Sequence, residues 1–205
     1  MKEMIKNSLI LFAITLVAGF ILGTVYDITK EPRAKQQVLA TQRAYKEVFA
    51  DGDKFEDADY KKDDLNKFIK ENGISANEAE IETIVKAIDK SGKDIGYVFT
   101  IISKEGYGGD IKFTLGVDME GSISGMSILS INETAGLGMQ ANTDGFKNQF
   151  KGINADKITF SKTGKSADNE IDAISGATIT TTTMVKGVNA GLFAFSYLTG
   201  GAANE

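Results

Sequence analysis

The chain has 205 residues, of which 42% are apolar, and a formal charge of −5 at pH 7. That length allows one membrane anchor and one soluble domain with its own core, and it argues against two large domains. Cysteine and histidine are absent, which excludes disulfides, thiolate iron–sulfur clusters, the usual haem ligands and serine–histidine or cysteine–histidine catalysis. Any redox chemistry therefore requires an organic cofactor, and the acidic charge argues against nucleic acid as a partner.

An uncharged stretch rich in Leu, Ile, Val and Phe runs from Ser8 to Tyr26. It is long enough to cross a hydrocarbon core of about 30 Å, and it predicts one transmembrane helix within an N-terminal anchor at residues 1–30. A cleaved signal peptide is the alternative, but no small-x-small cleavage site follows the stretch, which is also long for such a segment. Basic residues lie on both sides of it, so the charges leave the topology open.

Residues 31–80 are predicted to form a helical and charged connecting region. Apolar residues between Val38 and Phe49 follow a helical period after Pro32, which predicts a helix. From Asp51 to Lys70 acidic and basic residues alternate, and the acidic ones lack the glycine-and-glutamate layout of a calcium loop. We therefore expect a solvated surface region there and no cation site.

From Glu80 onward the pattern changes to alternation with a period of two, typical of strands. Four such segments, separated by turns, predict an antiparallel meander: residues 80–87, 95–103, 111–117 and 122–131. Helices before and after a run of consecutive strands indicate an α+β domain and disfavour a doubly wound α/β fold.

The loop from Asn132 to Asn142 contains several small residues, which would let backbone amides approach a planar ring or its polar edge. After it, Phe146, Phe150 and Ile153 have the spacing of a short helix with an apolar face. Core packing is the expected role of this face, and a hydrophobic wall beside the ring is the alternative.

The segment Asp172–Thr178 reads Asp-Ala-Ile-Ser-Gly-Ala-Thr and precedes a threonine run from Thr180 to Thr183. Two small residues leave the backbone before Thr178 uncovered, and apolar residues between Met184 and Phe195 recur at helical spacing. This pattern predicts that Thr178 lies just ahead of a helix N-terminus, a position that favours a phosphate group. The alternative is an ordinary Ser-Gly turn with threonines as N-caps.

The pattern Asp172-x-x-Ser175-Gly176-Ala177-Thr178 resembles the flavinylation motif of the FMN-binding domain family. In that family the last threonine carries FMN through a phosphoester bond made by a separate flavin transferase. Upstream, Tyr107-Gly108-Gly109 and Glu133-Thr134-Ala135-Gly136-Leu137-Gly138 resemble, in order and spacing, elements of the G subunit family of Rnf electron transport complexes. Ala135 stands where that family commonly has proline, and this departure concerns only the rigidity of the turn.

The resemblance implies FMN bound covalently to Thr178, in an FMN-binding domain at residues 81–198 that is followed by a flexible tail at residues 199–205. Asp172 would position the acceptor threonine or serve the transferase. Tyr107 would stack on the ring or pack at a hairpin end. The other cofactor-binding residues that the resemblance implies are Ser175, Gly176 and Ala177 near the phosphate, and Glu133, Thr134, Leu137 and Gly138 near the ring.

The resemblance also implies an electron-relay subunit of an ion-translocating ferredoxin:NAD oxidoreductase, with the other complex subunits and the flavin transferase as partners. It places the flavin domain on the outer face of the cytoplasmic membrane. Ion movement is expected in partner subunits, because the predicted helix has no intramembrane charge. The alternatives are the C subunit of a sodium-translocating NADH:quinone oxidoreductase, which is typically longer, and a noncatalytic membrane-tethered binding or assembly module.

Overall fold

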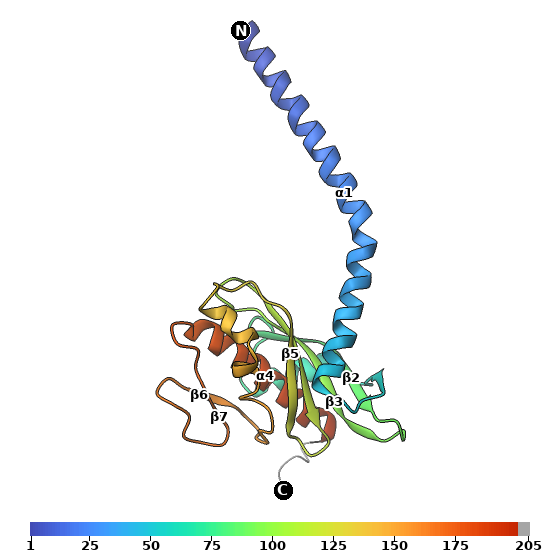
Figure 1. Ribbon diagram of the computed structural model, residues 1–205, viewed down its shortest axis with the longest axis vertical. Helices are drawn as coiled ribbons and strands as arrows, with labels where there is room; N and C mark the ends of the chain where they lie inside the picture. Colours follow the sequence, from blue (N-terminus) through green and yellow to red (C-terminus); the bar gives the residue numbers. More distant parts are fainter. Residues whose placement is uncertain (201–205) are drawn as a thin grey trace. The chain divides into compact units, whose positions relative to one another are not determined.

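The structure is a computed structural model that describes residues 1–200. The chain consists of two units: an N-terminal one, Met1–Ala40, and a compact one that starts at Thr41. Figure 1 shows the order of the elements along the chain. The first helix contributes residues to both units.

Helix α1 (Lys2–Val48) is the one helix among the described residues that is long and apolar enough to cross a membrane. All side chains from Ser8 to Tyr26 are exposed, as expected of a segment whose apolar surface faces lipid. Pro32 lies inside this helix, so the helix predicted after Pro32 is the continuation of the first one. Proline removes one backbone donor, and a long helix tolerates that loss where its other hydrogen bonds persist.

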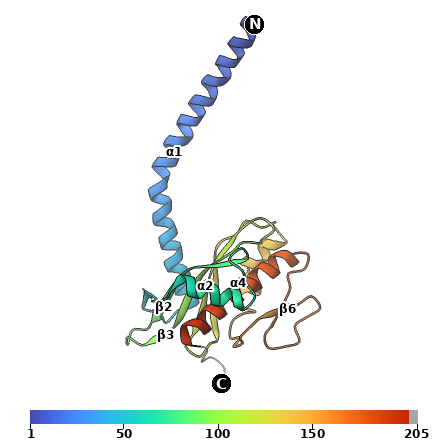
Figure 2. The same ribbon diagram turned by 180° about the vertical axis from the view of Figure 1, so that it is seen from behind.

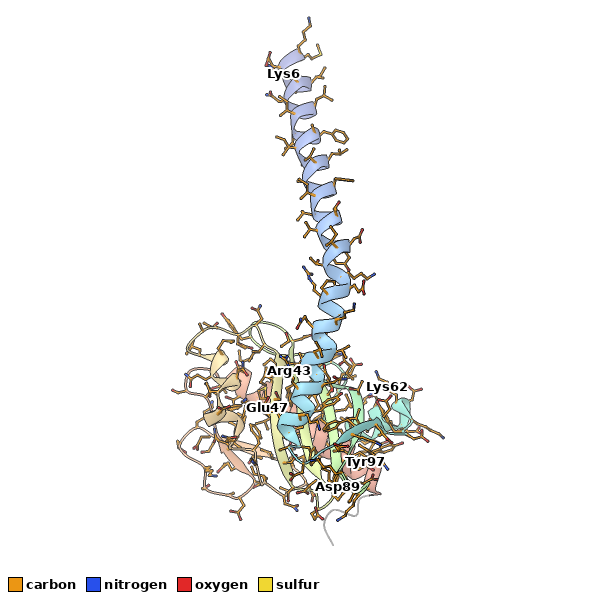
Figure 3. The ribbon with its side chains drawn as sticks, turned by 45° about the vertical axis from the view of Figure 1, so that its right-hand side comes forward. Lys6, Arg43, Glu47, Lys62, Asp89 and Tyr97 are labelled. Carbon is orange, nitrogen blue, oxygen red and sulfur yellow. The ribbon has the colours of Figure 1, made fainter. Side chains whose placement is uncertain are left out.

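The last turns of α1 pack on one face of the sheet of the compact unit. Tyr45, Val48 and Phe49 are buried in a cluster with apolar residues of the second and third strands. The Tyr45 hydroxyl lies 3.3 Å from the Thr100 hydroxyl, and Glu47, labelled in Figure 3, accepts a hydrogen bond of 2.6 Å from Ser127 Oγ. These contacts fix residues 41–48 to the domain.

A five-stranded antiparallel sheet forms the centre of the domain, in the order β1-β2-β3-β4-β5. Its last four strands confirm the predicted meander. The strands are β1 (Lys54–Asp57), β2 (Ala79–Ile88), β3 (Asp94–Ser103), β4 (Ile111–Asp118) and β5 (Ile123–Ser130). The edge strand β1 comes from the charged stretch that was expected to be a solvated surface region, and it pairs with β2 from Lys54 opposite Ile88 to Asp57 opposite Val85.

The other face of the sheet is covered by α4 (Thr178–Thr199) with α2 (Lys62–Glu71) beside it, as Figure 2 shows. Two glycines of α4 allow a close approach, because a Cβ on Gly187 would lie 2.8 Å from the Phe113 ring and one on Gly191 would lie 2.7 Å from Leu115. Although α2 belongs to the charged stretch, its Leu65 and Ile69 are buried. Because successive side chains of a strand point to opposite faces, the sheet supplies apolar side chains to the helices on both of its faces.

The remaining elements are short: the 3-10 helix η1 (Gly138–Asn142), the helix α3 (Asp144–Lys147), and the parallel pair β6 (Thr159–Ser161) and β7 (Glu170–Asp172). Phe146 and Phe150 are buried against each other, with ring centroids 5.5 Å apart. They pack in the core, which is the role expected for this segment, but only Phe146 lies in a helix, because α3 ends at Lys147. At the C-terminus, Thr199 ends α4 and Gly200 caps it; the rest of the predicted tail, residues 201–205, lies outside the described residues.

Candidate functional site

A cavity of about 550 Å³ lies where three segments meet: the loop after β3, the loop after β5 and the start of α4. Eight of the ten predicted site residues line it, all except Asp172 and Ser175. The complete lining is Tyr107, Glu133, Thr134, Leu137, Gly138, Gly176, Ala177, Thr178, Ile179 and Thr180. The structure therefore brings the three sequence motifs to a single place, although the last lies far from the first two in the chain.

The loops after β3 and β5 touch through their backbones. A Cβ on Gly108 would overlap the carbonyl group of Asn132, so this contact needs a residue without a side chain. The Gly108 amide donates to Glu133 Oε1 at 3.4 Å, and Asn132 Nδ2 donates to the Gly108 carbonyl at 3.4 Å. The Tyr-Gly-Gly motif therefore places Tyr107 beside the loop that carries Glu133.

Backbone hydrogen bonds shape the loop after β5. The amides of Leu137 and Met139 both donate to the Thr134 carbonyl at 3.1 Å, and Gln140 Nε2 donates to the Gly136 carbonyl at 2.8 Å. Gly136 has a φ of 76°, a left-handed conformation that favours glycine. These hydrogen bonds close the turn although position 135 is alanine and not proline.

Helix α4 begins at Thr178 itself, so the prediction that Thr178 lies ahead of the helix is corrected by one position. No side chain caps this helix, and the alternative in which the threonines are N-caps is therefore wrong. The Thr181 hydroxyl instead accepts from the Ile174 amide and donates to the Ala177 carbonyl, both at 3.0 Å. Because the first amides of a helix have no partner within it, this uncapped end presents free donors beside the cavity.

The small residues before Thr178 shape this end of the cavity. Gly176 has a φ of 75°, which turns the chain into the helix, and a Cβ there would lie 3.1 Å from Leu137 Cδ2. Glycine at this position therefore keeps the segment before Thr178 close to the loop after β5. Ala177 is buried, and Thr178 is half-buried and lines the cavity.

Asp172 and Ser175 do not line the cavity. The Asp172 carboxylate accepts a hydrogen bond of 2.6 Å from the Lys165 amide, and its own amide donates to Gln149 Oε1 at 2.7 Å. The side chain of Asp172 thus holds the loop between β6 and β7. Ser175 is exposed on the turn before α4. Their predicted roles toward the phosphate stay predictions.

The apolar part of the cavity is formed by exposed side chains. Tyr107 is 72% exposed, so it does not pack at a hairpin end, and Leu137 and Ile179 are exposed as well. Large exposed apolar side chains around a concave site are typical of a surface that contacts a ligand or a partner.

An ionic cluster fastens α4 to the segment that leads to Tyr107. Lys186 Nζ donates to Glu105 Oε2 and Glu78 Oε1, each at 2.6 Å, and the Thr183 hydroxyl donates to the Glu105 carbonyl at 2.8 Å. The hydrogen bond from Lys186, together with bonds from Ser75, lowers the pKa of Glu78 to about 2. The hydrogen bonds to Glu105 and Glu78 in turn raise the pKa of Lys186.

Comparisons with known proteins assign the chain to a family. Residues 106–192 match the FMN-binding domain, and residues 1–48 match the RnfG N-terminal region. The chain is 35% identical to the G subunit of the proton-translocating ferredoxin:NAD(+) oxidoreductase complex of Clostridium ljungdahlii, over 98% of both chains. It belongs to the G subunit family of Rnf complexes. The matched FMN-binding domain contains all three segments that line the cavity.

Further relatives support the assignment of this chain to the Rnf G subunit family. It is 32% identical to the G subunit of the Na(+)-translocating ferredoxin:NAD(+) oxidoreductase complex of Acetobacterium woodii, over 92% of this chain and 89% of that one. The crystal structure of Shewanella oneidensis NqrC has the same fold, with a TM-score of 0.50 and 18% identity over 76% of this chain and 88% of that one. The predicted α+β fold is thereby confirmed.

Two lining residues, Ile179 and Thr180, were not predicted as site residues. Thr180 belongs to the threonine run, and Ile179 is the apolar residue directly after Thr178. The available signal was their closeness to Thr178 in the chain. Which of these side chains faces the cavity depends on the residue at which the helix begins.

Proposed function

We propose that this protein is the FMN-carrying electron-transfer subunit of an ion-translocating ferredoxin:NAD oxidoreductase complex, with the FMN phosphate joined to Thr178 Oγ by a phosphoester bond. The observation that carries the proposal is the position of Thr178, at the first residue of an uncapped helix and on the wall of the cavity. The amides of that helix end would bind the phosphate, because helix N-termini favour anions.

The residues around the cavity fit a flavin. Its volume of about 550 Å³ lies in the usual range for small-molecule sites. Leu137, Ile179 and Tyr107 offer apolar surface to a planar ring, and Glu133 and Thr134 offer polar groups. When bound, FMN supplies the redox chemistry, and the protein sets its position and electronic surroundings.

The remaining predicted residues receive roles as part of the same proposal. Ser175, Gly176 and Ala177 shape the approach to the phosphate. Asp172 contributes while a flavin transferase attaches FMN to the protein. It either interacts with the transferase or holds the loop that contains Lys165. Neither role makes Asp172 a redox residue.

We further propose that α1 anchors the protein in the cytoplasmic membrane with the flavin domain on the extracytoplasmic side, and that the other Rnf subunits are its partners. Relatives of this chain are named as subunits of ion-translocating complexes, which supports an assembly of this kind. A covalent bond would be useful on that side, because a noncovalent flavin is lost when the free ligand falls below its dissociation constant.

The test is coexpression of the full chain with an active flavin transferase, followed by flavin fluorescence of the denatured protein and mass spectrometry of its peptides. The wild type and Thr178→Ser should carry FMN on residue 178, and Thr178→Ala should carry none. Thr182→Ala is the matched control, because its hydroxyl donates to the Thr178 carbonyl within the helix and does not line the cavity. A wild-type protein without flavin, or an adduct on another residue, would refute the covalent assignment.

A further inference from the structure

Thr180 differs from the three threonines that follow it. The hydroxyls of Thr181, Thr182 and Thr183 all donate to backbone carbonyls. The Thr180 hydroxyl has no hydrogen-bond partner within residues 1–200, although the residue is only 1% exposed and lines the cavity. Among the described residues, the fully enclosed side-chain atoms without a hydrogen-bond partner belong to Ser103 and Ser124. The Thr180 hydroxyl is instead open to the cavity, where it is free to bond to a ligand.

Glu133 is a second polar residue on the same cavity whose hydrogen-bonding capacity is largely unfilled. It is only 9% exposed, and no cation of the described chain lies within ion-pair distance of its carboxylate. Its one hydrogen bond, from the Gly108 amide, is long at 3.4 Å. A buried carboxylate is costly unless it is hydrogen-bonded, and it can only accept. Glu133 therefore favours a ligand that carries an N–H group.

Gly138 brings these two groups together. A Cβ at this position would lie 2.5 Å from Glu133 Oε2 and 2.7 Å from Thr180 Oγ1, so both oxygens flank the same point on the cavity wall. Only glycine allows this close approach, because a Cβ would collide with both side chains. The wall thus presents an acceptor and a hydroxyl donor side by side, one from the loop after β5 and the other from the first turn of α4.

We propose that Glu133 and Thr180 act as a pair that binds the imide edge of the flavin ring, with the carboxylate accepting from the ring N3–H and the hydroxyl donating to a neighbouring ring carbonyl. This inference rests on the proposed function, because it concerns the same cavity. An imide edge alternates carbonyl acceptors with one N–H donor, and the pair offers the complementary groups.

The pair also sets the reduction potential of the flavin. Reduction adds electrons, and negative charge gathers on the ring carbonyl and the nitrogen beside it. The Glu133 carboxylate repels that charge and lowers the potential, whereas a hydroxyl that donates to the carbonyl stabilises the charge and raises the potential. The two side chains therefore have opposite effects, which a merely structural role would not produce.

The experiment is a dithionite titration, followed by visible absorption, of the detergent-solubilised full chain loaded by the transferase. Glu133→Gln should favour the reduced flavin at least tenfold, equivalent to a rise of about 30 mV for a two-electron couple. Thr180→Val should disfavour it about fivefold, since it removes one hydrogen bond, and Thr180→Ser should restore the wild-type value. Thr182→Val and Glu120→Gln, which lie outside the cavity, should leave it unchanged.

Equal potentials in the wild type and both loaded variants, or shifts in the same direction, would overturn the inference while leaving the proposed function intact. A second measurement does not need covalent attachment. The apo Thr178→Ala protein should bind riboflavin at least tenfold more tightly than 3-methylriboflavin, in which the N3–H is replaced, and equal affinities would overturn the pairing. A wild type that carries no flavin despite an active transferase would instead refute the proposed covalent function.

Discussion

Lys186 Nζ donates to Glu78 Oε1 at 2.6 Å and joins the middle of α4 to the residue that precedes β2. The same ammonium group reaches Glu105, whose carbonyl accepts from Thr183. The helix that begins with Thr178 is therefore tied to the segment that leads to Tyr107. The position of the cavity wall at Thr178 relative to the wall at Tyr107 therefore depends on these hydrogen bonds.

The Glu78 bond makes the stability of the domain depend on pH. The pKa of Glu78 is about 2 in the folded protein, against an ordinary value of 4.5. Because the folded value is the lower one, the stabilisation is fully present above pH 4.5 and is lost as the pH falls toward 2. After allowance for solvent screening, it is worth about 2 kcal/mol. Glu78→Gln should lower the free energy of unfolding in urea by about this amount at pH 7 and by little near pH 2.

Glu120→Gln is the matched control for that prediction, because its side chain makes no ion pair within the described chain. It should leave the pH profile unchanged. The same loss for Glu78→Gln at pH 7 and near pH 2 would contradict the assigned pKa.

The sequence predicted those parts of the fold that rest on a regular pattern. The alternation in residues 80–131 identified four strands, because side chains alternate between the two faces of a strand. One face of β2, β3 and β4 packs on α4, and β5 contacts α3. The strand β1 and helix α2 were missed, because their apolar residues are few among many charges. In α2 only Leu65 and Ile69 are buried, and it is their packing beside α4 that makes this segment part of the domain.

The cavity required information that periodicity does not contain. The three motifs were identified by resemblance, and their meeting at one place depends on the sheet and on α4. Thr180 was missed because four adjacent hydroxyls look alike in a sequence. Only the position of the helix start decides that three of them bond to backbone carbonyls and that Thr180 faces the cavity.

Gly108 should not tolerate a side chain. A Cβ there would overlap the Asn132 carbonyl, and the two loops would separate. We expect Gly108→Ala to lower the free energy of unfolding by about 2 kcal/mol, as overpacking typically does, and to reduce flavin loading. Gly145→Ala is the control, because the nearest atom to its Cβ would be 4.0 Å away. Urea unfolding and gel fluorescence of both variants check this, and wild-type behaviour of Gly108→Ala would contradict the observed backbone contact.

Leu137 should affect the bound flavin more than it affects the stability of the fold. Its side chain is 42% exposed on the cavity rim, so Leu137→Ala removes only part of the buried surface of a core leucine and should lower stability by about 1 kcal/mol or less. If Leu137 covers the ring, the alanine variant should show stronger quenching of flavin fluorescence by iodide. Met119→Ala, also exposed but outside the cavity, is the control. Unchanged quenching would place the ring away from Leu137.

Asp172 should affect the attachment of FMN and the stability of a surface loop, and it should leave the reduction potential of the flavin unchanged. Its carboxylate holds the Lys165 amide at 2.6 Å and does not line the cavity. Asp172→Ala should therefore speed tryptic cleavage after Lys165 and reduce the fraction of protein that carries FMN, because the loop beside the acceptor segment loosens. The flavin that is attached should keep the wild-type potential, since no charge on the cavity wall has changed. A shifted potential in the loaded fraction would show that Asp172 acts on the ring, and wild-type loading with faster cleavage would limit its role to the loop.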